Sequence, residues 1–320
     1  MNSHSVTQVM RFKLIQGLSW VFPEYFGAIG TRLFLQPQRA APVTRWQNAF
    51  ADFDKSVIEV QGLRIPFWHK GSGPQILLVH GWENDHFALG GFVQPLLDQG
   101  YSVAALDLPA HGEADGKAAP LPLMAQAIAA VGQALPALHA VIAHSVGGAT
   151  SVLAMEEYAL NASRLVLIGA PQAASKQAIG QALATGLSSR AIKRMERQLQ
   201  HRLAAPLEHF QVDRGLGRID CQVLLVHAHD DRVVPIRAAQ KNAAARASQT
   251  LWLDQGGHNR PLGDPLVIGS VIDFLKISRR KNRHPSGLRY HPRFAQSVVQ
   301  NSVPHNAEQS YAGQSQAEPS

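Results

Sequence analysis

Residues 141–148 read Val-Ile-Ala-His-Ser-Val-Gly-Gly, and the fold prediction begins with them. An apolar run ends at Ser145, which small residues flank, and a helix-like pattern follows. The arrangement is typical of a nucleophile elbow, a tight strand-to-helix turn that projects a serine oxygen above a sheet and excludes bulk two positions to either side. The usual first glycine is Ala143 here, and the second is Gly147. A serine that caps a helix after a strand would give a similar pattern, so the motif needs partners.

Two loops downstream supply those partners. A serine hydroxyl becomes a strong nucleophile only when a base takes its proton and a third group holds the base. On a scaffold with this elbow, the acid and then the histidine follow the serine along the chain. The apolar run 222–226 leads into a loop with Asp230 and Asp231, and the run 250–253 leads into a loop with His258. Parallel sheets gather their active sites just past the carboxyl ends of their strands, so both loops are well placed.

Five motifs in this order resemble those of α/β-hydrolase-fold serine hydrolases, in the branch of esterases, lipases and peptidase-like enzymes. Besides the elbow they are LVHGW at 78–82, DLPAHG at 107–112, DRVVP at 231–235 and GGH at 256–258, and the resemblance covers about residues 56–277. It implies an α/β fold with a doubly wound, mostly parallel sheet and a helical cap inserted after the sixth strand. It says almost nothing about the substrate.

The resemblance also implies roles for single residues. Ser145 attacks a carbonyl carbon, and His258 takes the serine proton and returns it to the leaving group. Asp231 holds the imidazole, because the family places its acid directly before x-V-V-P. The neighbouring Asp230 is then expected to be a turn residue.

The oxyanion that develops during such an attack needs two preorganised backbone donors. The resemblance places them at the amides of Val146 and Trp82, and Gly81 lets the backbone approach the substrate. We expect His80 to orient this loop and His144 to pack or bond locally. One departure from the family pattern is Ala114, which stands where many relatives carry a loop serine and leaves the triad unaffected.

These motifs predict hydrolysis of a carboxylic ester, thioester or amide through an acyl-enzyme, without a cofactor. Carbon–carbon bond hydrolases and cofactor-free haloperoxidase-like enzymes use the same triad, and a non-catalytic ligand-binding protein could share the fold. A metal site is a further alternative, because residues 227–231 are similar to the H-x-H-x-D-H run of metallo-hydrolases. Arg232 replaces the last histidine of that run, so we predict no metal.

The composition suits a single large core with appendages, since 45% of the 320 residues are hydrophobic and 17% are charged. The only cysteine, Cys221, excludes an internal disulfide framework. The sequence contains no apolar run of transmembrane length and no secretory pattern at its start. We therefore expect a cytoplasmic protein with no stable membrane insertion, whose partner is a small acyl substrate. The sequence does not predict its oligomeric state.

The net charge of +7 lies mainly at the C-terminus, where seven Lys or Arg residues from Lys276 onward face two glutamates. Residues 278–320 are polar as well as basic and are predicted to be a disordered tail, so we expect no nucleic-acid partner. Residues 56–277 are the predicted hydrolase domain, with a helical cap at 172–219. Residues 1–55 are predicted to be a helical extension packed on the body, with an interfacial membrane helix as the alternative.

The predicted cap includes a basic helix near residues 189–203, with Glu196 as its only acidic residue. This face is either a solvated surface or a surface that favours substrates with a carboxylate or phosphate. Its basic residues are Arg190, Lys193, Arg194, Arg197 and Arg202.

Apolar periodicity predicts the remaining elements. An antiparallel hairpin opens the domain, and strands then alternate with helices as in a parallel sheet. The hairpin is expected at 56–60 and 63–69, the strands at 76–80, 102–107, 139–144, 164–169, 222–227 and 249–253, and the helices near 87–99, 121–135, 146–158, 236–246 and 265–277.

Overall fold

The computed structural model describes residues 3–39 and 44–276. Within them, eight strands form one sheet in the order β1-β2-β4-β3-β5-β6-β7-β8. The predicted α/β fold with a mostly parallel sheet is confirmed, because only the β1–β2 and β2–β4 pairs are antiparallel. The predicted tail, residues 278–320, lies outside the described residues. The strands are β1 Asp54–Val60, β2 Leu63–Lys70, β3 Gln75–Val79, β4 Ser102–Leu106, β5 Leu138–His144, β6 Ala162–Ile168, β7 Gln222–Ala228 and β8 Gln249–Leu253.

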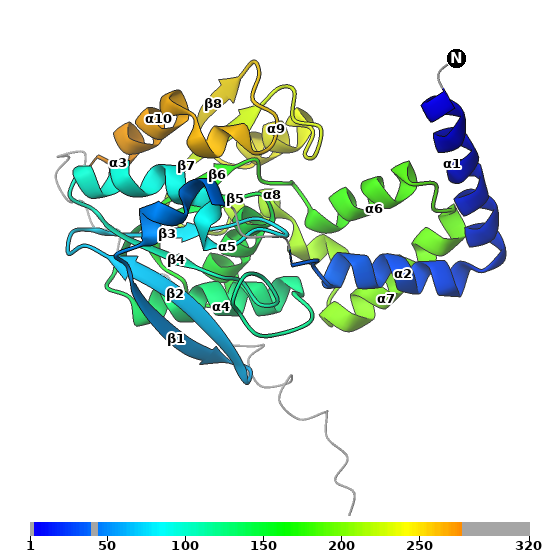
Figure 1. Ribbon diagram of the computed structural model, residues 1–320, viewed down its shortest axis with the longest axis horizontal. Helices are drawn as coiled ribbons and strands as arrows, with labels where there is room; N and C mark the ends of the chain where they lie inside the picture. The colour runs from blue at the N-terminus through cyan, green and yellow to red at the C-terminus, as the bar shows by residue number, and fades with distance from the viewer. Residues whose placement is uncertain (1–2, 40–43, 277–320) are drawn as a thin grey trace, which may run out of the picture. The chain divides into compact units, whose positions relative to one another are not determined.

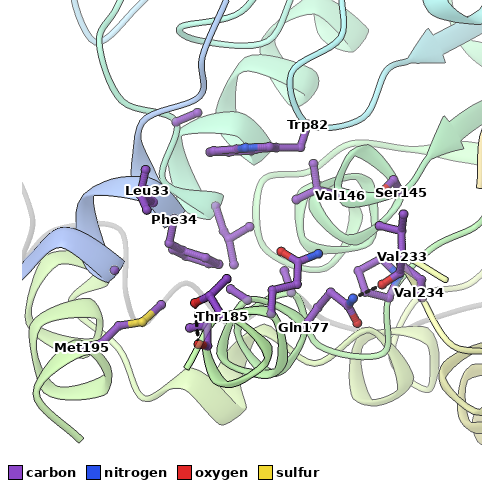
Figure 2. Close-up of a pocket in the computed structure, with 18 of the residues that line it drawn as sticks. Leu33, Phe34, Trp82, Ser145, Val146, Gln177, Thr185, Met195, Val233 and Val234 are labelled. Carbon is purple, nitrogen blue, oxygen red and sulfur yellow. Dashed lines mark hydrogen bonds between the residues drawn. The ribbon is translucent and has the colours of Figure 1, made fainter. Parts of the chain in front are cut away.

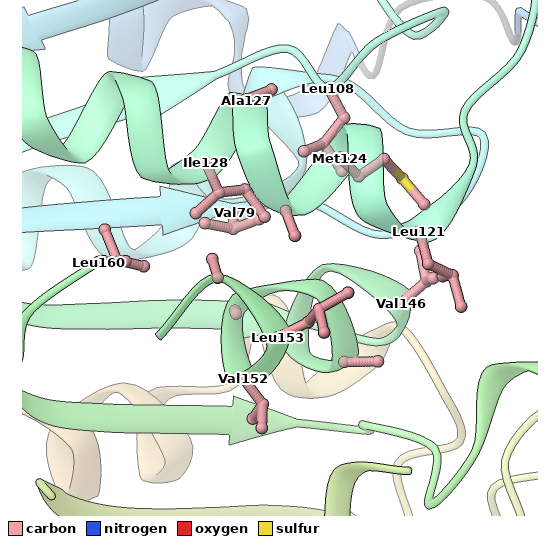
Figure 3. Close-up of a cluster of buried hydrophobic side chains, with 14 of the residues drawn as sticks. Val79, Leu108, Leu121, Met124, Ala127, Ile128, Val146, Val152, Leu153 and Leu160 are labelled. Carbon is pink, nitrogen blue, oxygen red and sulfur yellow. The ribbon is translucent and has the colours of Figure 1, made fainter. Parts of the chain in front are cut away.

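Helices cover both faces of the sheet. Because neighbouring residues of a strand point to opposite faces, each central strand contributes side chains to two cores. On β3, Leu77 and Val79 belong to a core formed with helices α4 and α5, whereas Ile76 and Leu78 belong to a second core with α3 and α10. Figure 3 shows part of the first core, between α4 and α5. The covering helices are α3 Val93–Asp98, α4 Leu121–Ala134, α5 Val146–Glu157, α9 Ile236–Ala245 and α10 Pro265–Leu275.

One predicted helix is divided in the structure. The sequence predicts a helix near residues 87–99, but a short 3-10 helix, η2 (His86–Phe92), precedes α3 there. Pro95 gives the physical reason: it lacks an amide hydrogen and its ring clashes with the carbonyl four residues earlier, so it fits only the first turn of a new helix. Two shorter helices therefore replace the predicted one.

The N-terminal helices pack on a helical insertion between β6 and β7 (Figure 1). α1 (Ser3–Val21) and α2 (Pro23–Leu35) both contact α7 (Ser189–Leu203), which follows α6 (Ala174–Ala184) in the insertion. A 3-10 helix, η3 (Leu207–Phe210), and α8 (Val212–Leu216) complete the insertion.

The α2–α7 contact is close because Gly27 carries no side chain. A β-carbon at this position would lie 2.7 Å from the β-carbon of Arg194. Across the same interface, the hydroxyl of Thr31 donates to Gln198 Oε1 at 3.1 Å. The end of α2 also joins the main core, where Leu35 is buried and its carbonyl accepts from the Ala119 amide. In the described part of the chain, no helix is long and apolar enough to cross a bilayer.

Candidate active site

Ser145 occupies the tight turn between β5 and α5. Its backbone angles, φ 52° and ψ −125°, are strained for a residue with a β-carbon. Gly147 permits the turn, because a β-carbon there would lie 2.2 Å from the carbonyl oxygen of His80. Ala143 is fully buried in the core beside α4 and α5, so its methyl group is accommodated. The turn therefore has the geometry of a nucleophile elbow.

The loop after β8 brings His258 to Ser145. Its Nε2 lies 2.9 Å from Ser145 Oγ, and its Nδ1 lies 2.7 Å from Asp231 Oδ2. With the ring proton on Nδ1, the imidazole donates to the carboxylate and Nε2 accepts from the hydroxyl. In this tautomer His258 can take the serine proton. Three residues that follow β5, β7 and β8 thus form one hydrogen-bonded chain.

Asp231 is the aspartate that meets the imidazole. Its other oxygen, Oδ1, accepts from the amides of Val233 at 2.8 Å and Val234 at 2.9 Å. Burial would raise the pKa of Asp231, but the bonds from His258 and these amides outweigh it and lower that pKa. The carboxylate is therefore ionised near neutral pH and holds the ring in one orientation.

Asp230 binds a second loop, whereas the sequence predicts only a local turn residue. Its Oδ1 accepts from the amides of Gly256 at 2.8 Å and Gly257 at 2.7 Å, in the loop that carries His258. The bond from Gly257 is the main cause that lowers the pKa of Asp230. One aspartate thus orients the imidazole, and its neighbour holds the loop. Nothing in the sequence identifies the amides that an exposed aspartate will bind.

His144 also acts across the chain, whereas we expected a local contact. Its Nε2 donates to the backbone oxygen of His258 at 3.1 Å, and the two rings lie 4.7 Å apart. Burial is the main cause that lowers the pKa of His144 to about 3. The ring is therefore neutral and places no positive charge beside His258.

Two backbone amides adjoin Ser145 at the pocket. Val146 begins α5, and amides in the first turn of a helix have no partner within the helix. Trp82 follows Gly81, where a β-carbon would lie 3.1 Å from the β-carbon of Ser145. Among the described residues, the amides of Val146 and Trp82 donate to no protein acceptor. Both are free to bind an anionic oxygen, and their role as the oxyanion hole stays a prediction.

Buried side chains hold the loop that contains Trp82. His80 donates from Nδ1 to the Gly81 carbonyl at 2.7 Å and accepts at Nε2 from the Leu108 amide at 3.0 Å. Burial above all lowers the pKa of His80 to about 3, in agreement with the single ring proton that these bonds require. Such a neutral, doubly bonded ring fits the orienting role that we expected for His80.

Asp107, from the motif after β4, braces the neighbouring segments. Its Oδ1 accepts from the amide of His86 at 2.7 Å and from Nδ1 of the same residue at 2.9 Å. Its Oδ2 accepts from the Glu113 amide at 2.7 Å. Burial would raise the pKa of Asp107, but the bond from His86 and further attractions lower it. The sequence motif marks this residue, but its structural role comes from contacts in three dimensions.

The residues of the metal alternative do not gather into one cluster, although His227 Nε2 lies 3.5 Å from Asp231 Oδ2. His227 is buried and donates from Nε2 to the Val234 carbonyl at 2.8 Å, whereas His229 is exposed. Over residues 3–39 and 44–276, no cluster of three or more His, Cys, Asp or Glu side chains is arranged to hold a metal ion.

A largely apolar pocket of about 340 Å³ opens beside Ser145 (Figure 2). Trp82 and Val146 line the end near Ser145, and the insertion contributes several small or polar side chains from α6. The opposite end is lined by the N-terminal helix α2, whose Leu33 and Phe34 appear in Figure 2. Residues 1–55 are predicted from the sequence only to pack on the body, so their contribution to this wall was not expected. The contributions of α2 are Ile29, Gly30, Leu33 and Phe34.

The basic side chains of α7 do not line this pocket. Within α7, only Met195 is among its lining residues. Arg194 instead pairs with Glu24 of α2 at 2.5 Å, and the guanidinium of Arg190 lies 4.8 Å from the ring centre of Trp20 in α1. The basic helix therefore faces the N-terminal helices and solvent, which gives no support to the alternative that it selects anionic substrates.

Comparison with known proteins agrees with this fold. An esterase from Pyrococcus furiosus aligns at 18% identity with a TM-score of 0.57, over 75% of this chain and 97% of its own. A membrane phospholipase A, described as a bacterial virulence factor, aligns at 18% identity with a TM-score of 0.54, over 86% and 98%. An esterase from Exiguobacterium antarcticum aligns at 19% identity with a TM-score of 0.53, over 70% and 98%.

No match was found among curated protein sequences. The model of one family, described as the alpha/beta hydrolase family, matches residues 76–268. This match spans more than half of the chain and includes Ser145, Asp231 and His258. The chain belongs to the alpha/beta hydrolase family.

Proposed function

We propose that the protein is a serine hydrolase that cleaves carboxylic esters of apolar acids through an acyl-enzyme intermediate. One observation carries the proposal: the hydrogen-bonded chain from Ser145 through His258 to Asp231, with the serine on the wall of an apolar pocket. Family membership alone would not carry it, because one fold hosts many chemistries.

The geometry supports two half-reactions. Ser145 Oγ attacks the ester carbonyl carbon as its proton passes to His258 Nε2, and the carbonyl oxygen becomes an anion facing the amides of Trp82 and Val146. The intermediate then collapses, and the leaving alkoxide takes the proton from His258. Water, deprotonated by the same imidazole, then attacks the acyl-serine carbonyl. Ser145 Oγ leaves, takes the proton back from His258, and the acid is released. Asp231 stabilises the imidazolium in both halves.

The pocket lining supports an uncharged, apolar acyl group. Among the described lining residues none carries a charged side chain, and the polar side chains are those of Ser145, Gln177, Gln181 and Thr185. An acyl chain that leaves water for these walls gains about 0.8 kcal/mol for each buried methylene. A thioester presents the same carbonyl, so it belongs in the substrate panel beside oxygen esters.

Covalent labelling tests the proposal. A fluorophosphonate should label the protein at Ser145, as located by peptide mass spectrometry. Ser145→Ala should lose both the label and the turnover of p-nitrophenyl esters, with a residual rate about a thousandfold above water from the remaining groups. Ser270→Ala, which changes a serine on α10 away from the pocket, is the matched control and should keep both.

The other outcomes separate the alternatives. Labelled protein that hydrolyses no ester or thioester would favour a carbon–carbon bond hydrolase or a haloperoxidase-like enzyme. Absence of labelling in the unaltered chain would favour a non-catalytic binding protein. Undiminished ester hydrolysis by Ser145→Ala would remove the serine-hydrolase proposal.

A further inference from the structure

Helix α1 has one face against the protein and an apolar face toward solvent. Ser19 is buried, and its hydroxyl accepts from the Ser188 amide at 2.9 Å, which marks the docked face. Met10, Leu14 and Val21 are 67%, 62% and 58% exposed. At 3.6 residues per turn these three side chains form one stripe on the side opposite Ser19. An exposed apolar stripe of this kind marks an interaction surface.

The apolar surface continues along α2 to the candidate active site. Phe22 and Tyr25 are 57% and 66% exposed where the two helices meet. Ile29 and Leu33 follow Tyr25 at intervals of four residues, so they lie on the same side of α2. Both of them also line the pocket, and Leu33 is 54% exposed. The apolar surface of the two helices therefore leads to the mouth of the pocket.

Positive charge surrounds this surface. Arg11 and Lys13 fall on the two flanks of the α1 stripe, by the same helical spacing. Arg190 lies over the ring of Trp20, whose side chain is 57% exposed beside the stripe. Together α1, α2 and α7 carry eight Lys or Arg side chains and two glutamates, of which Glu24 is paired with Arg194.

We infer that α1 and α2 bind the surface of an anionic lipid bilayer, with α1 lying in the plane of the interface. An apolar stripe flanked by basic side chains, with an aromatic residue at its edge, is the pattern of interfacial helices. Their basic residues are attracted to acidic headgroups.

Charge distinguishes the bilayer from other occupants. A second copy of the chain would bring two positively charged surfaces together, and the chain's own C-terminal segment is basic as well. The inference concerns binding only, so it does not rest on the proposed function.

Vesicle flotation of the full-length chain tests the inference. The protein should float with phosphatidylcholine vesicles that contain phosphatidylglycerol and much less with phosphatidylcholine alone. Leu14→Gln with Val21→Gln should weaken binding about tenfold or more, because two apolar side chains no longer enter the interface. Val57→Gln with Leu266→Gln is the matched control, since these side chains are 44% and 62% exposed on β1 and α10.

A charge variant supplies the second arm. Arg11→Gln with Lys13→Gln should weaken binding to the phosphatidylglycerol vesicles about tenfold and reduce its salt dependence. Every variant keeps the basic C-terminal segment, so that segment cannot account for a difference between them. A cooperative thermal unfolding transition like that of the unaltered chain would show that each variant is folded, and this measurement requires no enzymatic activity.

Three results would overturn the inference. The unaltered chain could fail to bind the anionic vesicles, or the control pair could lose as much binding as the α1 pair. The third is a dimer, seen by light scattering, that the Leu14→Gln and Val21→Gln changes dissociate. That result would show that a second copy covers the stripe.

Discussion

At the scale of single residues, the site is organised around the position of His258. Ser145 and Asp231 contact its two ring nitrogens, and His144 donates to its backbone oxygen. Asp230 binds the two glycine amides that precede it. The imidazole is thus held through its ring, its backbone and its loop, so changes at these positions should act on turnover in different degrees.

The adjacent aspartates can be separated by the same substitution. Asp231→Asn places an amide donor opposite Nδ1 and favours the wrong imidazole tautomer, so kcat should fall by about 10⁴. Asp230→Asn keeps an oxygen that can accept from Gly256 and Gly257, so kcat should change little. Steady-state kinetics on one ester measures both. A large loss confined to Asp230→Asn would make Asp230 the acid.

The role of Asp231 could be predicted from the sequence, whereas the contacts of Asp230 could not. Asp231 could be chosen only by its resemblance to the family pattern before x-V-V-P, because two neighbouring aspartates have the same chemistry. The contacts that distinguish them come from amides at 233–234 and 256–257, whose positions depend on how two loops fold. The hydrogen bond from His144 to the backbone of His258 could not be predicted for the same reason.

At the scale of elements, α2 connects two parts of the structure. Its end is buried in the main core, its middle packs on α7, and its exposed side lines the pocket. The pocket proposed to bind the acyl group therefore combines an N-terminal helix with an insertion between β6 and β7. Changes in either helix should alter the preference for acyl chain length.

Filling the pocket from α6 tests this arrangement. Ala182 lines the pocket, so Ala182→Phe should shorten the preferred acyl chain, while hydrolysis of an acetate ester is retained. Each methylene excluded from the pocket should lower kcat/KM about fourfold, from its transfer free energy. Ala184→Phe, at an exposed position of the same helix, is the matched control. Equal effects of the two variants on all chain lengths would show that the acyl group binds elsewhere.

The elements were predictable where local pattern determines them. β5 and α5 follow from an unbroken apolar run that ends at small residues, and the boundaries predicted for the other strands lie within two residues of those observed. The pairing of α2 with α7 was not predictable, because an apolar helix does not specify its partner. Thr31 and Met195, which meet there, are 164 residues apart.

At the scale of the whole molecule, buried neutral histidines link stability to pH. His80 and His144 have pKa values of about 3, chiefly because burial disfavours the charged ring. In the unfolded chain the same side chains have their ordinary pKa of 6.5, so they bind protons once the pH falls below that value. Between these values the unfolded state binds more protons, so the free energy of unfolding decreases as the pH falls.

Urea unfolding at several pH values should show this loss. Each of the two histidines should contribute about 1.4 kcal/mol per pH unit below about pH 6. The lowered pKa values of Asp107 and Asp231 act in the same direction at lower pH, because both carboxylates must be protonated as the protein unfolds. His144→Gln should reduce the slope by about one proton. An unchanged slope would mean that His144 is protonated in the folded state.

The separation of α2 from α7 along the chain also matters while the protein is being synthesised. At about 5–20 residues per second, a ribosome needs roughly 10–30 s to pass from Thr31 to Met195. Strands β1 to β6 are all made in that interval, before α7 exists. Nascent chains stalled before residue 189 should therefore leave α2 open to protease, and chains stalled well beyond residue 221 should protect it. Helices α1 and α2 therefore leave the ribosome long before α7, and the pocket is completed only after Val234 has been made.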